Sequence, residues 1–239
     1  MTFLLDFIAD AQGDTSVAAL LRKMKVLGTF TQTPALRDWA SLEINGYPAD
    51  TPPPPYRGPI AIRPLGHFMG PFGSELQNVP IPSTTFPKKM RNGQLFSLVL
   101  TQGVAELETY SNADVTNFAW TADFVRMYNY MVEQKEVQRI VDSTYGLVNV
   151  QYSISSAHFR GVIDAIRNKA LDLSLELYES APHAGESDAD IETTTAAQKT
   201  INNFINYNFP NADLSGSNNA FGSETFTQQS SLTHDASDH

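Results

Sequence analysis

The stretch TPALRDWASLEINGYP, residues 33–48, specifies a helix whose start and end are both marked in the sequence. Thr33 can accept a hydrogen bond from a free backbone N–H group of the first turn. Pro34 fits the first helical position because no N–H group is needed there. At the other end, Gly46 suits a left-handed terminating residue and Pro48 blocks continuation. The stretch therefore predicts one complete helix.

The side chains of this helix divide into an apolar stripe and a polar face. The stripe consists of Leu36, Trp39, Ala40, Leu42 and Ile44. Glu43 falls on the polar face, where we expect it to stay in water, and Tyr47 is expected to pack back against Leu42. Glu43 and Tyr47 could form a partner-binding site at the helix exit. A purely capping and packing role is favoured, because helix termination already explains both residues.

Residues 1–96 outside this helix predict two more helices and a proline-rich segment. The first helix is short, and the second covers residues 14–31, with apolar residues at helical spacing. Residues 50–96 contain ten prolines, which cannot sit in helix interiors or central strands. We predict short edge strands at residues 56–62 and 76–81, joined by a turn at residues 66–73.

The second half of the chain predicts more helices and a β-hairpin, so the fold class is α+β. Apolar spacing indicates helices at residues 95–110 and 117–134. β-prone residues with a central glycine predict two strands within residues 136–153. Ser155 or Ser156 then caps a long helix that ends near Ser180. Aromatic residues around Trp120 could form a small-molecule receptor, although their helical spacing favours core packing.

The charge of the chain is uneven. The net charge is −10, and residues 181–239 hold one lysine against eight acidic residues, whereas residues 1–95 are weakly basic. An acidic chain is unlike a sequence-independent nucleic-acid binder, which needs a dense basic surface. Without cysteine there is neither a disulfide scaffold nor thiolate chemistry. No apolar run reaches the roughly 18 residues that span a bilayer. We expect a cytoplasmic protein that does not enter the membrane.

The composition changes after Pro182. Residues 181–239 are acidic and rich in Asn, Ser and Thr, which predicts a linker and tail after a domain at residues 1–180. A short amphipathic helix is predicted near residues 196–208. Its apolar side chains either dock on the chain's own core or anchor a partner, and the sequence leaves both open. These side chains are Ile201, Phe204, Ile205 and Phe209.

The proline-rich segment also holds the best candidates for binding nucleic acid. Clustered Lys and Arg side chains are all that phosphate contact requires. Solubilising charge on a loop is the favoured explanation, and nucleic-acid binding stays the alternative. The candidates are Arg57, Arg63, Lys88, Lys89 and Arg91.

No sequence motif identifies a catalysed reaction. The five histidines form no HExxH pair, and no GxSxG elbow occurs. The acidic residues 188–192 lack the glycine and the final glutamate of a calcium loop. We therefore assign no catalytic residue, metal or cofactor. Whether the chain is an enzyme stays open, with a non-enzymatic role favoured.

Three segments together resemble the AbiTii family. They are WASLEINGYP at residues 39–48, NVPIPSTTFP at residues 78–87 and IDAIRNKALDLSLELYE at residues 163–179. The resemblance covers about residues 1–180. It implies a prokaryotic module of abortive infection and phage defence, with no established catalytic residues to carry over.

The resemblance and the lack of catalytic motifs lead to a protein-interaction, sensor or adaptor module as the expected function. A separate effector or sensor protein is the expected partner, and a homo-oligomer is left open. The nucleic-acid alternative uses the basic residues within residues 57–91 and includes a nuclease component.

Overall fold

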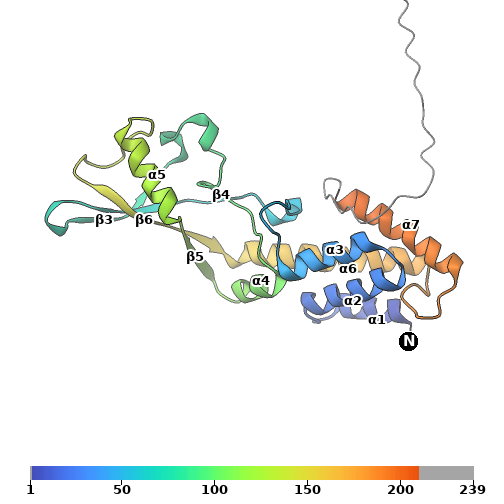
Figure 1. Cartoon of the computed structure of the whole chain (residues 1–239). Helices are drawn as coiled ribbons and strands as arrows, with labels where there is room; N and C mark the ends of the chain where they lie inside the picture. Colours follow the sequence, from blue (N-terminus) through green and yellow to red (C-terminus); the bar gives the residue numbers. More distant parts are fainter. Residues whose placement is uncertain (1, 210–239) are drawn as a thin grey trace, which may run out of the picture.

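The computed structural model describes residues 2–209 and consists of a helical bundle joined to a β-sheet lobe (Figure 1). The helices and strands mix in an α+β fold, which confirms the predicted class. The helices are α1 Phe3–Gln12, α2 Val17–Phe30, α3 Pro34–Asn45, α4 Val104–Ser111, α5 Ala122–Glu133, α6 Ser156–Ser180 and α7 Ile191–Asn208. The strands are β1 Ile60–Ala61, β2 Leu65–Met69, β3 Glu75–Pro80, β4 Ser97–Leu98, β5 Val115–Ala119 and β6 Gly146–Ser155.

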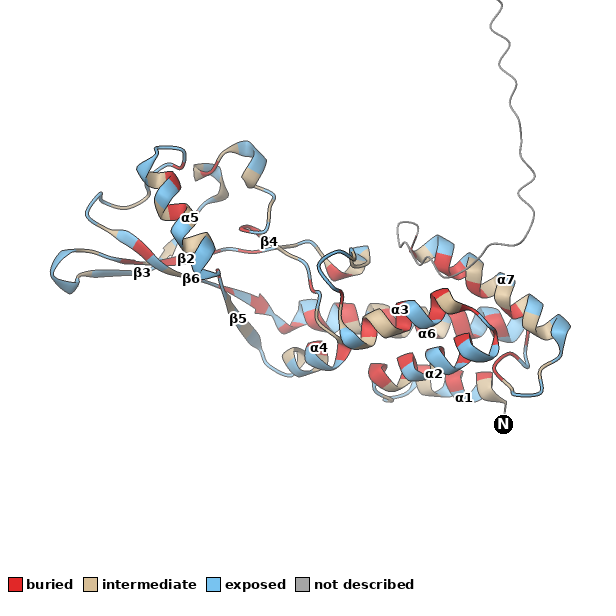
Figure 2. Ribbon diagram, viewed as in Figure 1, coloured by how far each residue is buried: buried red, intermediate tan, exposed pale blue. Residues whose placement is uncertain are grey.

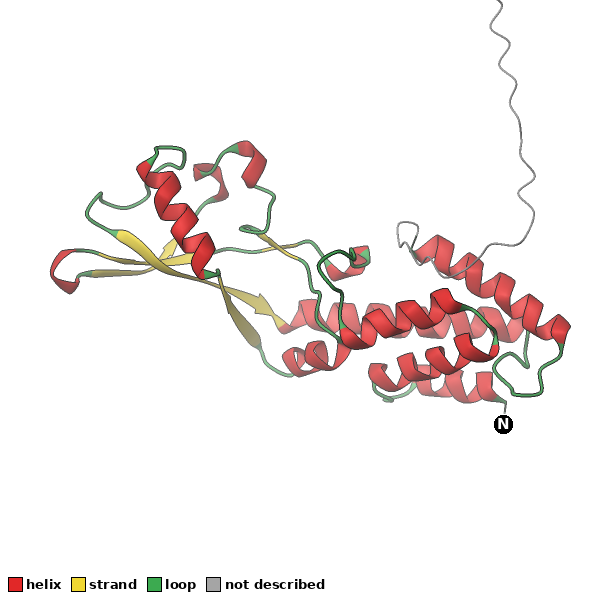
Figure 3. Cartoon of the chain, viewed as in Figure 1, coloured by secondary structure: helices red, strands yellow, loops and turns green. Residues whose placement is uncertain are grey.

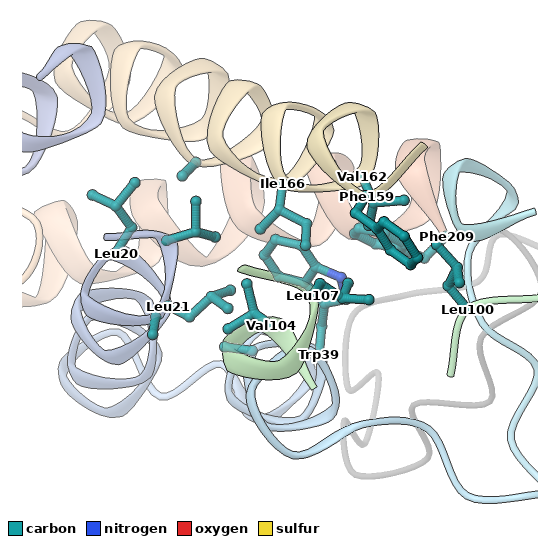
Figure 4. Packing of buried hydrophobic residues seen from close by; sticks show 14 of the residues in the cluster. Leu20, Leu21, Trp39, Leu100, Val104, Leu107, Phe159, Val162, Ile166 and Phe209 are labelled. Carbon is teal, nitrogen blue, oxygen red and sulfur yellow. The ribbon is translucent and has the colours of Figure 1, made fainter. Parts of the chain in front are cut away.

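The long helix α6 is the centre of the bundle. It packs against α1, α2, α4 and α7, while α2 and α3 pair with each other (Figure 3). Trp39 of α3 lies in the same apolar cluster as Leu107 of α4 and Ile166 of α6 (Figure 4). Burying such side chains removes about 25 cal/mol of unfavourable hydration free energy per Å². The bundle is therefore held by apolar side chains from helices far apart in sequence.

The sheet lobe contains an antiparallel sheet with strand order β3-β2-β6-β5. Helix α5 packs against β6, and the buried strand residues alternate with exposed ones, so one face belongs to the core and the other faces solvent (Figure 2). A separate two-stranded sheet pairs β1 with β4. Strand β6 runs directly into α6, because the Ser155 hydroxyl accepts a hydrogen bond from Ala157 N and caps the helix. This junction connects the two lobes.

The opening stretch forms α3 as predicted, with a different N-cap. Gly46 ends the helix with φ +93°. The Thr33 hydroxyl makes no capping bond; it pairs instead with the buried hydroxyl of Thr31 at 2.8 Å. Pro34 and Gly46 therefore set the helix limits.

Several predicted elements have different boundaries. The turn expected at residues 66–73 begins with β2, where a Cβ on Gly66 would lie 2.6 Å from the Phe68 ring. This glycine is needed for packing within a strand rather than for a turn. Residues 56–62 contain the end of the 3-10 turn η1, Pro55–Arg57, and one short strand, β1, whereas residues 76–81 fall largely within β3.

The helices predicted at residues 95–110 and 117–134 both begin later than expected. In the first, Leu95 and Phe96 lie in a turn before β4 and Leu100 follows β4; all three are buried, and only α4 is helical. In the second, β5 precedes α5, which begins after the Thr121 cap. Buried residues outside the helices, such as Phe96, Leu100 and Trp120, matched the helical spacing. Residues 136–153 contain part of one strand, β6, instead of the two predicted.

Helix α7 replaces much of the predicted linker. The helix expected near residues 196–208 starts earlier, at Ile191, and it packs on α6 and α3. The rings of Phe204 and Phe209 lie 6.4 and 5.0 Å from the Trp39 ring between centroids. Residues 181–209 therefore belong to the folded bundle, which corrects their description as linker. The rest of the predicted tail lies outside the described residues.

Replacement of Phe204 by Ala should lower the free energy of unfolding by about 3–5 kcal/mol, the usual effect of truncating a buried aromatic residue. Thermal or urea denaturation of the full chain measures the loss. Tyr207→Ala is the matched control, because Tyr207 is on the same helix and is 87% exposed. Equal stability of Phe204→Ala and the control would contradict the packing of α7 on the bundle.

Candidate functional site

A buried ion pair lies where α3 meets the proline-rich segment. The Glu43 and Arg57 side chains are both 0% exposed, and Arg57 Nη2 lies 2.5 Å from Glu43 Oε2. Tyr47 and Tyr56 donate their hydroxyl protons to Glu43 Oε1 at 2.5 and 2.6 Å. Buried charges are tolerated only when paired and hydrogen-bonded, and both conditions are met here.

Arg57 Nε also donates to Glu43 Oε2, at 3.2 Å, whereas the Nη1 donor of Arg57 binds the backbone. Its Nη1 donates to the carbonyl oxygens of Leu100 and Gln102 at 2.9 and 2.8 Å. The guanidinium also lies over the Tyr47 ring, 4.9 Å from its centroid. Arg57 thus ties α3 to the segment that leads into α4.

The tyrosine hydroxyls in this cluster stay protonated. Burial, followed by the nearby Glu43 carboxylate, raises the pKa of Tyr47 well above its ordinary value, and the same two causes raise the pKa of Tyr56. Both hydroxyls therefore remain hydrogen-bond donors at any physiological pH. Their role is to satisfy a buried carboxylate.

The burial of this cluster corrects three predictions. Glu43 does not stay in water, and Arg57 cannot reach a phosphate group because its side chain is enclosed. Tyr47 is 7% exposed and its hydroxyl donates to Glu43, so it is not available to bind a partner. Neither Glu43 nor Tyr47 presents a free side chain to a partner.

Glycines allow the close backbone approach on which the cluster depends. Gly46 has a positive φ, and a Cβ there would lie 2.7 Å from Thr101 O. A Cβ on Gly103 would lie 2.3 Å from Ile44 O. Tyr47 N donates to Thr101 O at 2.8 Å across this contact. A larger residue at either position would separate the two segments.

A second feature is an open cleft in the proline-rich segment, which we call the proline cleft. Its volume is about 780 Å³. Prolines and apolar side chains form most of the wall, and Arg63 and Arg91 contribute positive charge. The lining residues are Pro59, Ala61, Ile62, Arg63, Pro64, Leu65, Pro80, Ile81, Pro82, Ser83, Arg91, Asn92, Phe96 and Ser97.

The two cleft arginines are held differently. Arg91 Nε donates to Phe86 O at 2.9 Å and Arg91 Nη2 donates to Thr84 O at 3.1 Å. The side chain of Arg91 is therefore fixed by its own loop. Arg63 is exposed. One fixed and one exposed guanidinium are suited to binding an anionic group at the cleft.

The structure brings together part of the predicted basic set. Arg63 and Arg91 line the proline cleft, while Lys88 and Lys89 lie on the exposed 3-10 turn η4, Lys88–Met90, directly before Arg91. Arg57 is separated from them by its burial. The cleft wall itself was missed from the sequence, although the density of prolines around two arginines was its signal.

The other predicted site residues belong to the core. Ile201, Phe204, Ile205 and Phe209 are all buried, which selects docking on the chain's own core over exposure to a partner. Trp120 is 6% exposed and meets the Phe86 and Phe96 rings edge-on at 6.5 and 6.3 Å. The aromatic cluster therefore packs the sheet lobe instead of forming an open receptor.

The AbiTii family model matches residues 4–204, which is most of the chain. The chain belongs to the AbiTii family. The predicted resemblance is confirmed, and the AbiTii match extends into α7. The family associates this chain with abortive infection, a defence against phage. No curated protein and no solved structure matches the chain significantly.

Among the described residues of this AbiTii chain, no helix is long and apolar enough to cross a membrane. No group of three or more His, Cys, Asp or Glu side chains in residues 2–209 is placed to hold a metal ion.

Replacement of Glu43 by Gln should lower the free energy of unfolding by about 3–5 kcal/mol, because it leaves the Arg57 charge buried without its partner. Chemical denaturation monitored by circular dichroism measures the loss. Glu106→Gln provides the matched control. Glu106 also accepts a hydrogen bond from a tyrosine hydroxyl, that of Tyr110 one helical turn away, but this pair is exposed. The control should behave like the unchanged chain. A Glu43→Gln protein as stable as the control would contradict the structural role of the ion pair.

Proposed function

We propose that this AbiTii chain is a protein-interaction module of an anti-phage system, acting as a sensor or adaptor without a catalytic step. The partner is a separate effector or sensor protein, and the proline cleft receives it. The observation that carries the proposal is the combination of an apolar proline wall with Arg63 and Arg91, in a chain whose net charge is −10.

The wall of the cleft favours an extended peptide segment. Proline has a fixed φ and no N–H group, so a proline wall offers apolar surface that loses little conformational freedom on binding. Strands β1 and β4 beside it are only two residues long. A peptide can lay apolar side chains on the wall and still place its backbone in solvent.

The charge of the cleft favours an acidic segment. Arg63 and Arg91 can each form a charge-assisted hydrogen bond with a carboxylate, and Arg does so with defined geometry. A local positive site on an acidic protein also steers an acidic partner toward this surface and away from the rest. The lack of cysteine fits a cytoplasmic site of action.

Nucleic acid is the second candidate ligand, and one observation favours it. Lys88 and Lys89 are exposed three and two residues before Arg91, so they extend the positive charge beyond the cleft. A phosphate backbone would use this extension, whereas a short acidic peptide seated in the cleft would not.

Replacement of Arg63 by Glu should weaken partner binding by about tenfold or more and abolish phage defence, because it puts a negative charge where a carboxylate is expected. The thermal midpoint should stay unchanged, since Arg63 is exposed. Arg22→Glu is the control, an identical charge change on the exposed side of α2. Full defence by Arg63→Glu in a phage-plating assay would refute the role of the cleft.

Replacement of both Lys88 and Lys89 by Glu separates the two ligands. For a peptide-binding cleft, we expect defence and partner binding to stay near normal. For nucleic acid, the change should weaken DNA or RNA binding, and that binding should fall steeply with salt. Fluorescence anisotropy with labelled DNA and RNA at two salt concentrations measures this. Salt-sensitive binding that the double replacement removes would replace our proposal by the nucleic-acid alternative.

A further inference from the structure

Strand β5 forms an edge of the four-stranded sheet. Within the described residues its sole strand partner is β6, to which it is antiparallel. Figure 1 shows it as the outer strand between α4 and α5. An edge strand presents a row of backbone N–H and C=O groups that a further strand can use.

The hydrogen bonds at both ends of β5 show which residues face outward. Trp120 N donates to Val150 O at 3.0 Å, and Ser156 N donates to Asp114 O at 3.2 Å. In an antiparallel ladder, every second residue bonds to the neighbouring strand. The even-numbered residues from 114 to 120 therefore bond to β6, and the odd-numbered residues of β5 face away from it.

The outward-facing residues are Val115, Asn117 and Ala119, and all three are exposed. The backbone N–H and C=O groups of these residues point to the free edge. On the opposite face of the strand, the Phe118 ring stacks on Tyr152, with 5.7 Å between centroids. The edge is thus held in a regular, firmly packed strand.

This edge lacks the usual protection against strand pairing. Natural edges are blocked by lysine, other charges, proline or a bulge. The sequence of β5, VTNFA, contains no charge and no proline, and its register with β6 is uninterrupted. Strand β3, at the opposite edge, ends in Pro80 and carries Glu75. The β3 edge is therefore guarded against pairing with another strand, whereas the β5 edge is not.

We propose that β5 pairs with β5 of a second copy of this chain, antiparallel and with the two-fold axis at Asn117. This register places Asn117 opposite its own copy and Val115 opposite Ala119 of the second copy. Each opposed pair exchanges two backbone hydrogen bonds, so the three pairs give about six. The two sheets become one continuous sheet.

The side chains fit this self-pairing. No like charges meet across the new strand pair, which would oppose association. On the solvent face, Val115 gains an apolar neighbour; it is 51% exposed in the single chain. On the other face, Phe118 lies opposite Thr116 of the second copy, an aromatic and β-branched pair of the kind that stabilises sheets. A short strand pair buries less than a standard interface of about 1,600 Å², so the dimer should depend on protein concentration.

Single charge replacements at the two-fold axis test this dimer. In Asn117→Lys, two lysines face each other, and in Asn117→Glu, two glutamates do. Each variant alone should dissociate at least about tenfold more readily than the unchanged chain, because like charges are directly opposed. An equal mixture of the two variants should regain dimerisation, because Lys then faces Glu. Sedimentation equilibrium of the full chains over a range of concentrations measures all three.

Gln77→Lys on the guarded edge, β3, is the matched control and should dimerise normally, because Gln77 is an exposed residue away from the pairing surface. Thermal melting confirms that each variant is folded. An unchanged chain that stays monomeric at all concentrations would overturn the proposal. So would a dimer that neither Asn117 variant weakens, or one that their mixture fails to restore.

Discussion

The buried charge of Glu43 is the constraint on which the arrangement of the two lobes depends. A carboxylate without water must be compensated on both oxygens, and this chain recruits partners from well-separated segments to do so. Tyr47 comes from the end of α3, and Tyr56 and Arg57 come from the turn η1, Pro55–Arg57. Arg57 in turn takes the carbonyl groups before α4. The cost of desolvating one charge thereby fixes the path by which the chain leaves the bundle and returns to it.

The same cluster extends to the end of the described chain. The Trp39 indole donates to the Tyr56 hydroxyl at 3.3 Å, and Lys169 of α6 lies 5.6 Å from the centroids of both the Tyr56 and Phe209 rings. Burial lowers the pKa of Lys169, and the Asp172 and Glu43 carboxylates partly oppose this shift. Helix α7 therefore covers a partly charged surface as well as an apolar one. Its place close to α3 follows from the packing of the Phe204 and Phe209 rings against Trp39.

Local physics in the sequence predicted the regular helices well and the site poorly. Pro34 and Gly46 set the limits of α3, and the serines near residue 155 set the start of α6, because helix termini depend on adjacent residues. Glu43 shows the limit of prediction from local sequence spacing. Its place on the helix predicts exposure, whereas its burial depends on Arg57 and two tyrosines whose proximity no local spacing encodes. The proline cleft was not predicted for the same reason, since its walls come from the segment before β2, the end of β3 and the segment before β4.

The separation of Arg57 from Arg63 and Arg91 has a physical consequence for how the cleft is presented. Arg57 neutralises the buried charge of Glu43 and holds one end of the proline-rich segment against the bundle. The position of that end of the segment is therefore fixed. Prolines stiffen the segment between, and Arg91 fixes its far loop by two bonds to backbone carbonyl groups. A surface built in this way is shaped before any ligand arrives, and less of the binding free energy is lost to ordering it. The buried Arg57 therefore helps to hold in place the segment that carries the exposed Arg63 and the partly buried Arg91.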